Sequence, residues 1–159
     1  MAQTGFVLTD EGRTLTVLND SGTTAIEAGD IVWTATNDDA LTGTAASARN
    51  AYAGGDVKVK SMTDSATGYL TVLGVATEDI PADGYGAIAM EGVFIHAVDE
   101  NIEAGACVQG DEAATNKLMD LDAYTVTTSM PASVIRAKIG VALTGGTADG
   151  KYIIWKLAL

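Results

Sequence analysis

Residues 56–62 read Asp-Val-Lys-Val-Lys-Ser-Met, an alternation that places Val57, Val59 and Ser61 on one side and Lys58 and Lys60 on the other. Successive side chains of a β-strand point to opposite faces, so this period of two predicts a strand whose lysines face water. The stretch decides the fold class because the segments around it also have a composition typical of strands.

Seven other segments are rich in β-branched and aromatic residues and are also expected to form strands. They are residues 13–18, 30–36, 69–76, 87–98, 123–128, 133–143 and 151–157. Turn dipeptides stand between them at Gly54-Gly55, Asp83-Gly84, Gly145-Gly146 and Asp149-Gly150. Together they predict an all-β fold, a single-domain β-sandwich or β-barrel of short antiparallel strands with glycine turns over residues 13–159. The expected core includes Val32, Leu70, Val72, Val93, Ile95, Ile135, Ile139, Val141 and Ile153.

Residues 1–12 precede the first clear strand and allow two interpretations. Phe6, Val7 and Leu8 form an apolar trio that could belong to an extended N-terminal arm pairing with a partner's sheet. The same trio could be the first strand of the chain's own sheet. Arg136 and Lys138, in the weakly basic end of the chain, are candidates for electrostatic contact with a partner. Residues 37–52 could hold a short helix or a surface loop.

The net charge is −12, and residues 1–122 hold five Lys and Arg against twenty Asp and Glu. Proteins that bind DNA or RNA place a basic face on the phosphates and release counterions, so nucleic acid is not an expected partner. No apolar stretch approaches the ~20 residues of a membrane helix. The start of the chain also lacks the basic and apolar regions of a signal peptide. No membrane association is expected.

Residues that usually carry catalysis or bind metals are sparse. His96 is the only histidine and Cys107 the only cysteine, so neither has a second side chain of its kind to share a metal. We expect His96 to be a strand residue without a chemical role and Cys107 to be a small buried hydrophobe. Neither a phosphate-binding loop nor a nucleophile elbow occurs, and no cofactor or metal is expected.

One motif resembles an enzyme's. Asp20-Ser21-Gly22-Thr23 follows apolar residues much as the catalytic turn of aspartic proteases follows a strand. Those proteases need two such aspartates sharing a proton, whereas Asp-Ser-Gly is also an ordinary turn sequence. The acidic pairs Asp38-Asp39 and Asp120/Asp122 lack the spacing of a calcium loop and are expected to be solvated. The chain is therefore not expected to be an enzyme.

Residues 26–32, Ile-Glu-Ala-Gly-Asp-Ile-Val, recur at residues 102–108 as Ile-Glu-Ala-Gly-Ala-Cys-Val, and residues 80–84 give a weaker third copy. Each copy reads as a turn followed at once by a strand. Such an echo arises either from a true structural repeat or from the convergence of similar turns.

The order of these motifs resembles that of the small capsid cement proteins of tailed phages. The resemblance rests on Glu27 to Val32, Gly74-Val75-Ala76, residues 79–84, Gly92-Val93-Phe94 and Ala104-Gly105. It continues through Ile139-Gly140-Val141-Ala142, Gly145-Gly146 and the final apolar strand at 152–155. The departures are the long 37–52 segment and Ala106-Cys107, where an acidic residue is typical.

The resemblance implies a structural virion protein that binds the outer surface of an assembled capsid and bridges neighbouring major capsid subunits. The implied partners are the major capsid protein and further copies of the chain, in a dimer or trimer. The alternative is a β-structured host- or carbohydrate-binding module, such as a head spike or tail tip. Such modules display exposed aromatic clusters, whereas Trp33 and Trp155 lie in strand-like runs and are expected in the core.

Overall fold

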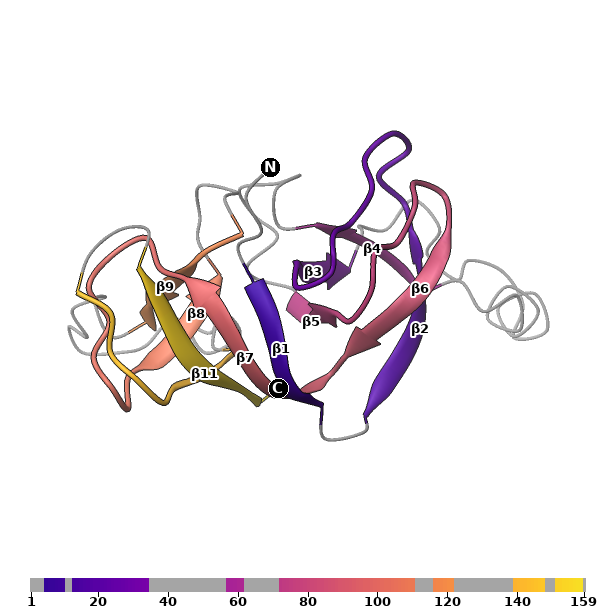
Figure 1. The fold of residues 1–159 in the computed structure, drawn as a ribbon. Helices are drawn as coiled ribbons and strands as arrows, with labels where there is room; N and C mark the ends of the chain where they lie inside the picture. The colour runs from indigo at the N-terminus through magenta and orange to yellow at the C-terminus, as the bar shows by residue number, and fades with distance from the viewer. Residues whose placement is uncertain are drawn as a thin grey trace, which may run out of the picture.

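The computed structural model describes residues 5–10, 13–34, 57–61, 72–110, 116–121, 139–147 and 151–158. This part of the chain is all-β, as the sequence predicts (Figure 1). The strands are β1 (Gly5–Asp10), β2 (Thr14–Asn19), β3 (Ile31–Thr34), β4 (Lys58–Ser61), β5 (Val72–Ala76), β6 (Tyr85–Ala89), β7 (Glu91–Ala97), β8 (Cys107–Gly110), β9 (Leu118–Asp120), β10 (Gly140–Ala142) and β11 (Tyr152–Ala158).

Strands β2 to β6 form a closed barrel in the order β2-β4-β3-β5-β6, called barrel one below. The strand expected from the Lys58 alternation is present as β4, with Val59 and Ser61 buried. All pairings in this barrel are antiparallel except β2 with β4, where Leu18 pairs with Lys58 in parallel register. That parallel pair closes the ring.

The remaining strands form a six-stranded sheet in the order β1-β7-β11-β10-β8-β9. A parallel bridge between Val98, just after β7, and Leu118 of β9 joins two members of this sheet that are not neighbours in that order. Strands β7, β11, β10, β8 and β9 thus close into a second ring, called barrel two, and β1 is added along β7. Figure 1 shows the two barrels side by side, with β1 between them.

The two barrels have the same strand order, so β2, β4, β3, β5 and β6 correspond to β7, β9, β8, β10 and β11. The backbone hydrogen bonds that close the two rings also correspond. The N–H of Asp20 donates to the carbonyl oxygen of Val59 at 2.9 Å, and the N–H of Asp99 donates to that of Leu118 at 3.0 Å. The fold is therefore a tandem repeat of one small barrel.

The sequence echo follows from this repeat. Residues 26–30 enter β3 and residues 102–106 enter β8, which are corresponding strands. In both turns the fifth residue donates its N–H to the carbonyl oxygen of the second, at 3.0 and 3.1 Å. Gly29 and Gly105 have φ of 91° and 93°, a conformation that favours glycine. Of the two readings of the echo, the structural repeat is the one observed.

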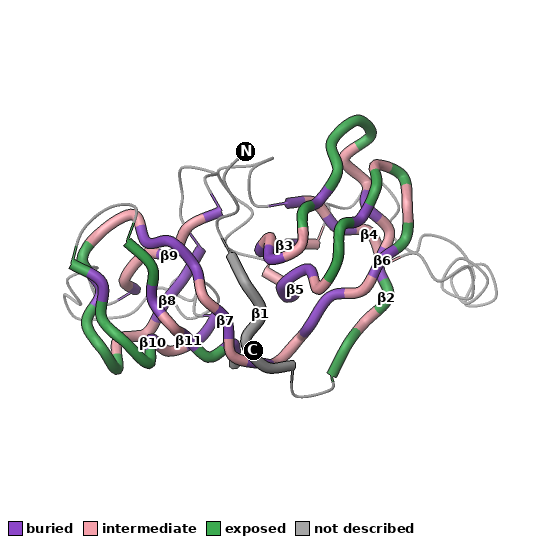
Figure 2. Tube along the Cα trace, viewed as in Figure 1, coloured by how far each residue is buried: buried purple, intermediate pink, exposed green. Residues whose placement is uncertain are grey.

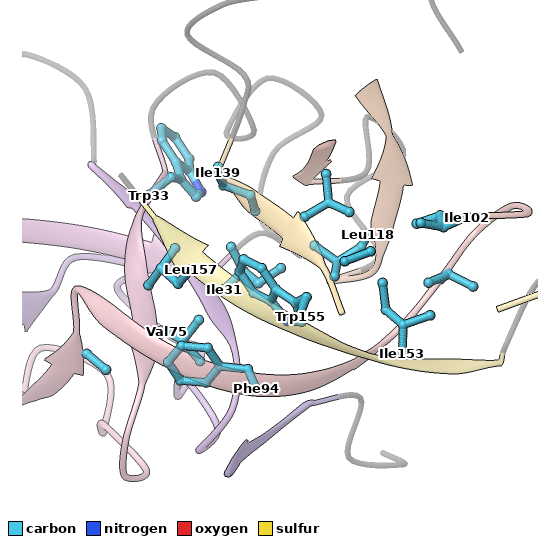
Figure 3. Close-up of a cluster of buried hydrophobic side chains, with 14 residues drawn as sticks. Ile31, Trp33, Val75, Phe94, Ile102, Leu118, Ile139, Ile153, Trp155 and Leu157 are labelled. Carbon is cyan, nitrogen blue, oxygen red and sulfur yellow. The ribbon is translucent and has the colours of Figure 1, made fainter. Parts of the chain in front are cut away.

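The described residues contain two clusters of buried side chains. Figure 2 marks the buried stretches of the backbone in purple. The barrel-one cluster contains Val17, Ile26, Val32, Val59, Ala76, Ile80 and Ile88. The larger cluster, drawn in Figure 3, combines residues of barrel two with Ile31, Trp33, Val75 and Ala89 of barrel one. Strand β3 serves both clusters because its residues alternate between them.

The expected core is confirmed at Val32, Ile139 and Ile153, and both tryptophans are buried as expected. The assignment was wrong at Val93, Ile95 and Val141, which are half-buried, and Val72 is partly buried against the larger cluster. The buried residues of β7 include Phe94 and His96, because the face opposite to Val93 and Ile95 is the one turned inward. Leu70 and Ile135 lie outside the described residues.

The single strand expected over residues 87–98 is two strands. It divides at Met90, whose N–H donates to the carbonyl oxygen of Arg13 at 2.8 Å. β6 before this point belongs to barrel one, and β7 after it belongs to barrel two. The junction between the repeats is a single residue, so the hydrophobic pattern runs through it without interruption.

Candidate functional site

The predicted partner-contact segment at Phe6, Val7 and Leu8 lies in β1, at an edge of the six-stranded sheet. The backbone of β1 pairs with β7 of the same chain, Phe6 opposite Ile95 and Val7 opposite Phe94. The register shifts between Val7 and Thr9. This placement matches the second of the two sequence interpretations, a strand in the chain's own sheet. Arg136 and Lys138 lie outside the described residues.

A buried polar joint connects the barrels at Gly29 and His96. The Nε2 atom of His96 lies 2.7 Å from the carbonyl oxygen of Gly29, and the indole N–H of Trp155 donates to Nδ1 of His96 at 2.9 Å. A neutral ring with its proton on Nε2 satisfies both contacts. Burial lowers the pKa of His96 to about 4, and the bond to Gly29 opposes this shift only in part. His96 is thus a structural residue of the joint.

Next to the His96 contact, the side chain of Asn116 of barrel two makes hydrogen bonds to the turn that leads into β3. Its Oδ1 accepts from the N–H of Ile31 at 2.7 Å, and its Nδ2 donates to Oδ1 of Asp30 at 2.7 Å. The other carboxylate oxygen of Asp30 accepts from the hydroxyl of Ser61 at 3.0 Å. Asn116 is itself buried, so the group is sheltered from competing water. These contacts help hold the barrels as one unit.

The Asp20 turn has the character of a surface turn. Asp20 lies 3.8 Å from Lys58, and the side chain of the buried Asn19 holds the turn through the carbonyl of Thr24 at 2.9 Å. Barrel two repeats the ion pair at the corresponding position, where Lys117 lies 3.2 Å from Asp99. The pairing of Asp20 with a lysine is the arrangement of an ion pair in a repeat, rather than of two aspartates sharing a proton.

Acidic side chains line the turns between strands. The exposed acids there are Glu27, Glu78, Asp79, Asp83 and Glu103. Asp79 also stabilises the turn at residue 28, whose N–H donates to Asp79 Oδ1 at 2.8 Å. Within the described residues, acidic and other metal-binding side chains form no group of three that could hold a metal ion. In the same part of the chain, no helix is long and apolar enough to span a membrane.

The sequence indicates the repeat but not the polar contacts between the barrels. The bond of His96 to Gly29 links residues 67 positions apart, so no local pattern indicates it. Asn116 was not singled out, because it stands in a polar stretch with no periodic pattern. The echo of residues 26–30 at 102–106 was the available signal, since a repeat implies two bodies and an interface between them.

Comparison with known proteins gives one family. The sequence model of a phage cement protein family matches residues 53–157, about two thirds of the chain. No curated protein matches the sequence. Among solved structures, one similar chain is described as the crystal structure of head fiber gp8.5 N base in bacteriophage phi29. The TM-score is 0.47 at 11% identity, over 92% of this chain and 93% of that one.

Proposed function

Because this chain belongs to the phage cement protein family and is thus an accessory protein of the phage capsid, we propose that it binds the outer surface of the assembled shell and bridges neighbouring major capsid subunits. The family match is the observation that carries the proposal. It spans β4, β5 and β6 of barrel one and all of barrel two except the last residue of β11.

The tandem barrels suit a bridging role. A bridge must resist being pulled apart, and the barrels share a cluster of buried side chains as well as the Gly29–His96 and Asp30–Asn116 contacts. A ligand that binds only the assembled lattice stabilises it by RT ln(1 + [L]/Kd). Attachment at more than one point strengthens this effect without stronger single contacts.

The charge of the chain supports an outer position. A protein of net charge −12 on the inner face would meet packaged DNA, whose phosphates repel it. A protein on the outer face does not meet the packaged DNA. The same acidic residues also keep the protein soluble before it binds the capsid. Arg136 and Lys138 supply positive charge that an acidic capsid surface would favour, which is part of this proposal.

The edge of β1 is the proposed strand of contact with the capsid. Only β7 pairs with β1 among the described strands, so β1 ends that sheet. An edge strand can take up a further strand from a partner through backbone hydrogen bonds, with side chains such as those of Phe6, Val7 and Leu8 giving specificity.

The experiment is co-sedimentation of the purified protein with expanded capsids that lack it, followed by heating of the decorated shells. We expect saturable binding and a higher temperature of capsid disruption, because the protein binds the lattice and not its separated subunits. Unexpanded capsids are the control for a lattice-specific site. Binding without any gain in capsid stability would refute bridging, and recovery with host cells rather than capsids would favour the host-binding alternative.

A further inference from the structure

Outward-facing residues of barrel one form a short row across three strands. Leu18 of β2 lies opposite Tyr85 of β6 in the antiparallel ladder and opposite Lys58 of β4 in the parallel pair. Opposite residues share a face, and the adjacent Val17 is buried on the other face of β2. The Nζ atom of Lys58 lies 3.8 Å from Oδ1 of Asp20, just after β2. Tyr85, Leu18, Lys58 and Asp20 are called row one below.

The corresponding residues of barrel two are called row two, and they are Tyr152, Ala97, Lys117 and Asp99. Tyr152 lies opposite Ala97 in the β7–β11 ladder. Lys117 precedes Leu118, whose carbonyl oxygen accepts the ring-closing hydrogen bond from Asp99. The Nζ atom of Lys117 lies 3.2 Å from Oδ1 of Asp99, so the ion pair of row one is repeated. Three of the four positions therefore carry the same residue in both barrels.

The tyrosines are the largest exposed side chains of the two rows. Tyr85 is 55% exposed and Tyr152 is 47% exposed, so neither fills the interior of a barrel. Burial of apolar area stabilises a fold, and these rings contribute little of it. The packing of the chain therefore gives no reason for a tyrosine at this position in both barrels.

Most other outward positions of the strands carry different residues in the two barrels. Val75 and Val141 are identical, but Val75 is buried in the larger cluster. The pairs that differ include Thr14 and Val93, Thr16 and Ile95, Ala87 and Ile154, and Lys60 and Met119. Exposed positions usually accept substitution with little change in stability. Identical tyrosine, lysine and aspartate residues in both rows therefore indicate a shared role in recognition.

The two rows lie on opposite sides of the junction between the barrels. β6 ends at Ala89, and Ala158 at the end of β11 pairs with Glu91, so both strands end at the junction. Tyr85 and Tyr152 are the first residues of these strands. At about 3.3 Å per residue, they lie about 13 Å and about 20 Å along their strands from the junction. Figure 1 shows β6 and β11 approaching the C-terminus from opposite sides.

We propose that row one and row two are two equivalent attachment sites, through which a single chain holds two neighbouring copies of the major capsid protein. This inference rests on the proposed function and adds to it the surfaces that make the contact. Two equivalent sites fit two identical partners, and an assembled shell presents copies of one protein at a fixed spacing. A bridge of this kind lies within one chain and needs no association between chains.

Each row has the composition of a small contact site. Tyrosine is enriched among the residues that dominate binding, because its ring supplies contact area at a low cost in conformational entropy. The lysine and aspartate beside it suit the polar rim around such a residue. Their charges cancel, so a row meets an acidic surface without the repulsion that the acidic turns would cause. The matching element of the capsid protein should present an apolar side chain to the ring and polar groups to the ion pair.

The test compares wild-type protein with Y85A and Y152A by co-sedimentation with expanded capsids that lack the protein, followed by heating of the decorated shells. Each variant loses one of two attachment points, so each should bind about a hundredfold more weakly. At saturating concentration each should bind without raising the temperature of capsid disruption, because one attachment point cannot connect two subunits. Y85T and Y152T, which keep a residue suited to strands, replace any alanine variant that melts below the wild type.

The control is L143T. Leu143 is 50% exposed, and its counterpart in barrel one is Thr77, since each donates its N–H to the corresponding carbonyl oxygen of β6 or β11. This variant removes an exposed apolar side chain outside the rows and should bind and stabilise capsids as the wild type does. An equal loss in L143T would overturn the assignment of the contact to the rows.

Equal losses in Y85A and Y152A are the expected result. Variants that match the wild type in binding and in capsid stability overturn this inference alone, and so does a loss confined to one row. Variants that keep capsid binding but lose binding to host cells overturn it in favour of the host-binding alternative. Wild-type protein that fails to bind or to stabilise capsids refutes the proposed function, and this inference with it.

Discussion

The indole N–H of Trp155 donates a hydrogen bond of 2.9 Å to Nδ1 of His96, and the two rings meet edge to face at 72° with centroids 5.5 Å apart. This bond requires the unprotonated nitrogen, so a charged His96 would lose it. The ring is fully buried, which makes its charged form costly.

Acid should therefore weaken the protein through His96. Its pKa is 6.5 when unfolded and about 4 when folded, so its stabilising effect is complete above pH 6.5 and is lost progressively as the pH falls toward 4. The expected loss is about 3 kcal/mol of unfolding free energy, at 1.4 kcal/mol per pKa unit. Denaturant unfolding at several pH values measures it. His96→Phe is the control, because the acidic residues titrate in both proteins; equal pH slopes in the two would contradict the assignment.

Gly74 and Gly140 occupy corresponding positions in the two Gly-Val-Ala strands and should both resist substitution. A Cβ at Gly74 would lie 2.3 Å from the carbonyl oxygen of Ala89, and one at Gly140 would lie 2.2 Å from that of Lys156. We expect Gly74→Ala and Gly140→Ala each to cost about 3 kcal/mol, since overpacking against backbone forces the strands apart. Thermal unfolding measures the effect.

The control for these variants is Gly22→Asn. Gly22 has φ of 74°, which asparagine tolerates, and nothing lies within 4 Å of the added Cβ. Its expected change is within about 0.5 kcal/mol. If Gly140→Ala were as mild as Gly22→Asn, the close approach of β10 and β11 would be refuted.

Asn116→Ala should loosen the contact between the barrels. It removes two hydrogen bonds and leaves the N–H of Ile31 without its partner, for an expected loss of about 3 kcal/mol. Because Asn116 has φ of 55°, part of the loss is backbone strain. Asn116→Gly relieves that part alone and should fall between the two proteins in denaturant unfolding. Asn101 is exposed, so Asn101→Ala is the neutral control. An equally small effect of Asn116→Ala would count against a stabilising role of the Asn116 hydrogen bonds.

Deleting residues 2–9 should lower the melting temperature, because it removes most of β1 and its pairing with residues 93–96 of β7. At about 1 kcal/mol per hydrogen bond, the expected cost is a few kcal/mol. Deletion of residues 2–4 is the control that keeps β1. An unchanged melting temperature in the longer deletion would instead support an arm that is free to pair with the capsid.

The sequence was sufficient for the fold class and for strands such as β2, β4, β5 and β11, because their patterns and glycine turns are local. It was insufficient for the orientation of β7, where Val93 and Ile95 are as apolar as Phe94. Alternation then identifies two faces without telling which is inside. The residues misassigned to the core, Val93, Ile95 and Val141, are half-buried residues on the outward side of β7 and β10.

Contacts between residues far apart in the sequence could not be predicted either. The contact of Asn116 with Asp30 joins residues 86 positions apart, and no local pattern encodes it. The N-terminal segment left two interpretations because an apolar trio suits an arm and an edge strand equally well. Only the pairing of Phe6 with Ile95 distinguishes them in the structure.

The two barrels contribute unequally to the clusters of buried side chains. The interior cluster of barrel one is made of its own residues alone, whereas the cluster that fills barrel two takes Ile31, Trp33, Val75 and Ala89 from its neighbour. A fragment ending at Ala89 therefore keeps every member of its own cluster, while a fragment beginning at Glu91 lacks four members of the larger one. The ribosome delivers barrel one first, so its own cluster can form before the residues that complete the larger cluster are made.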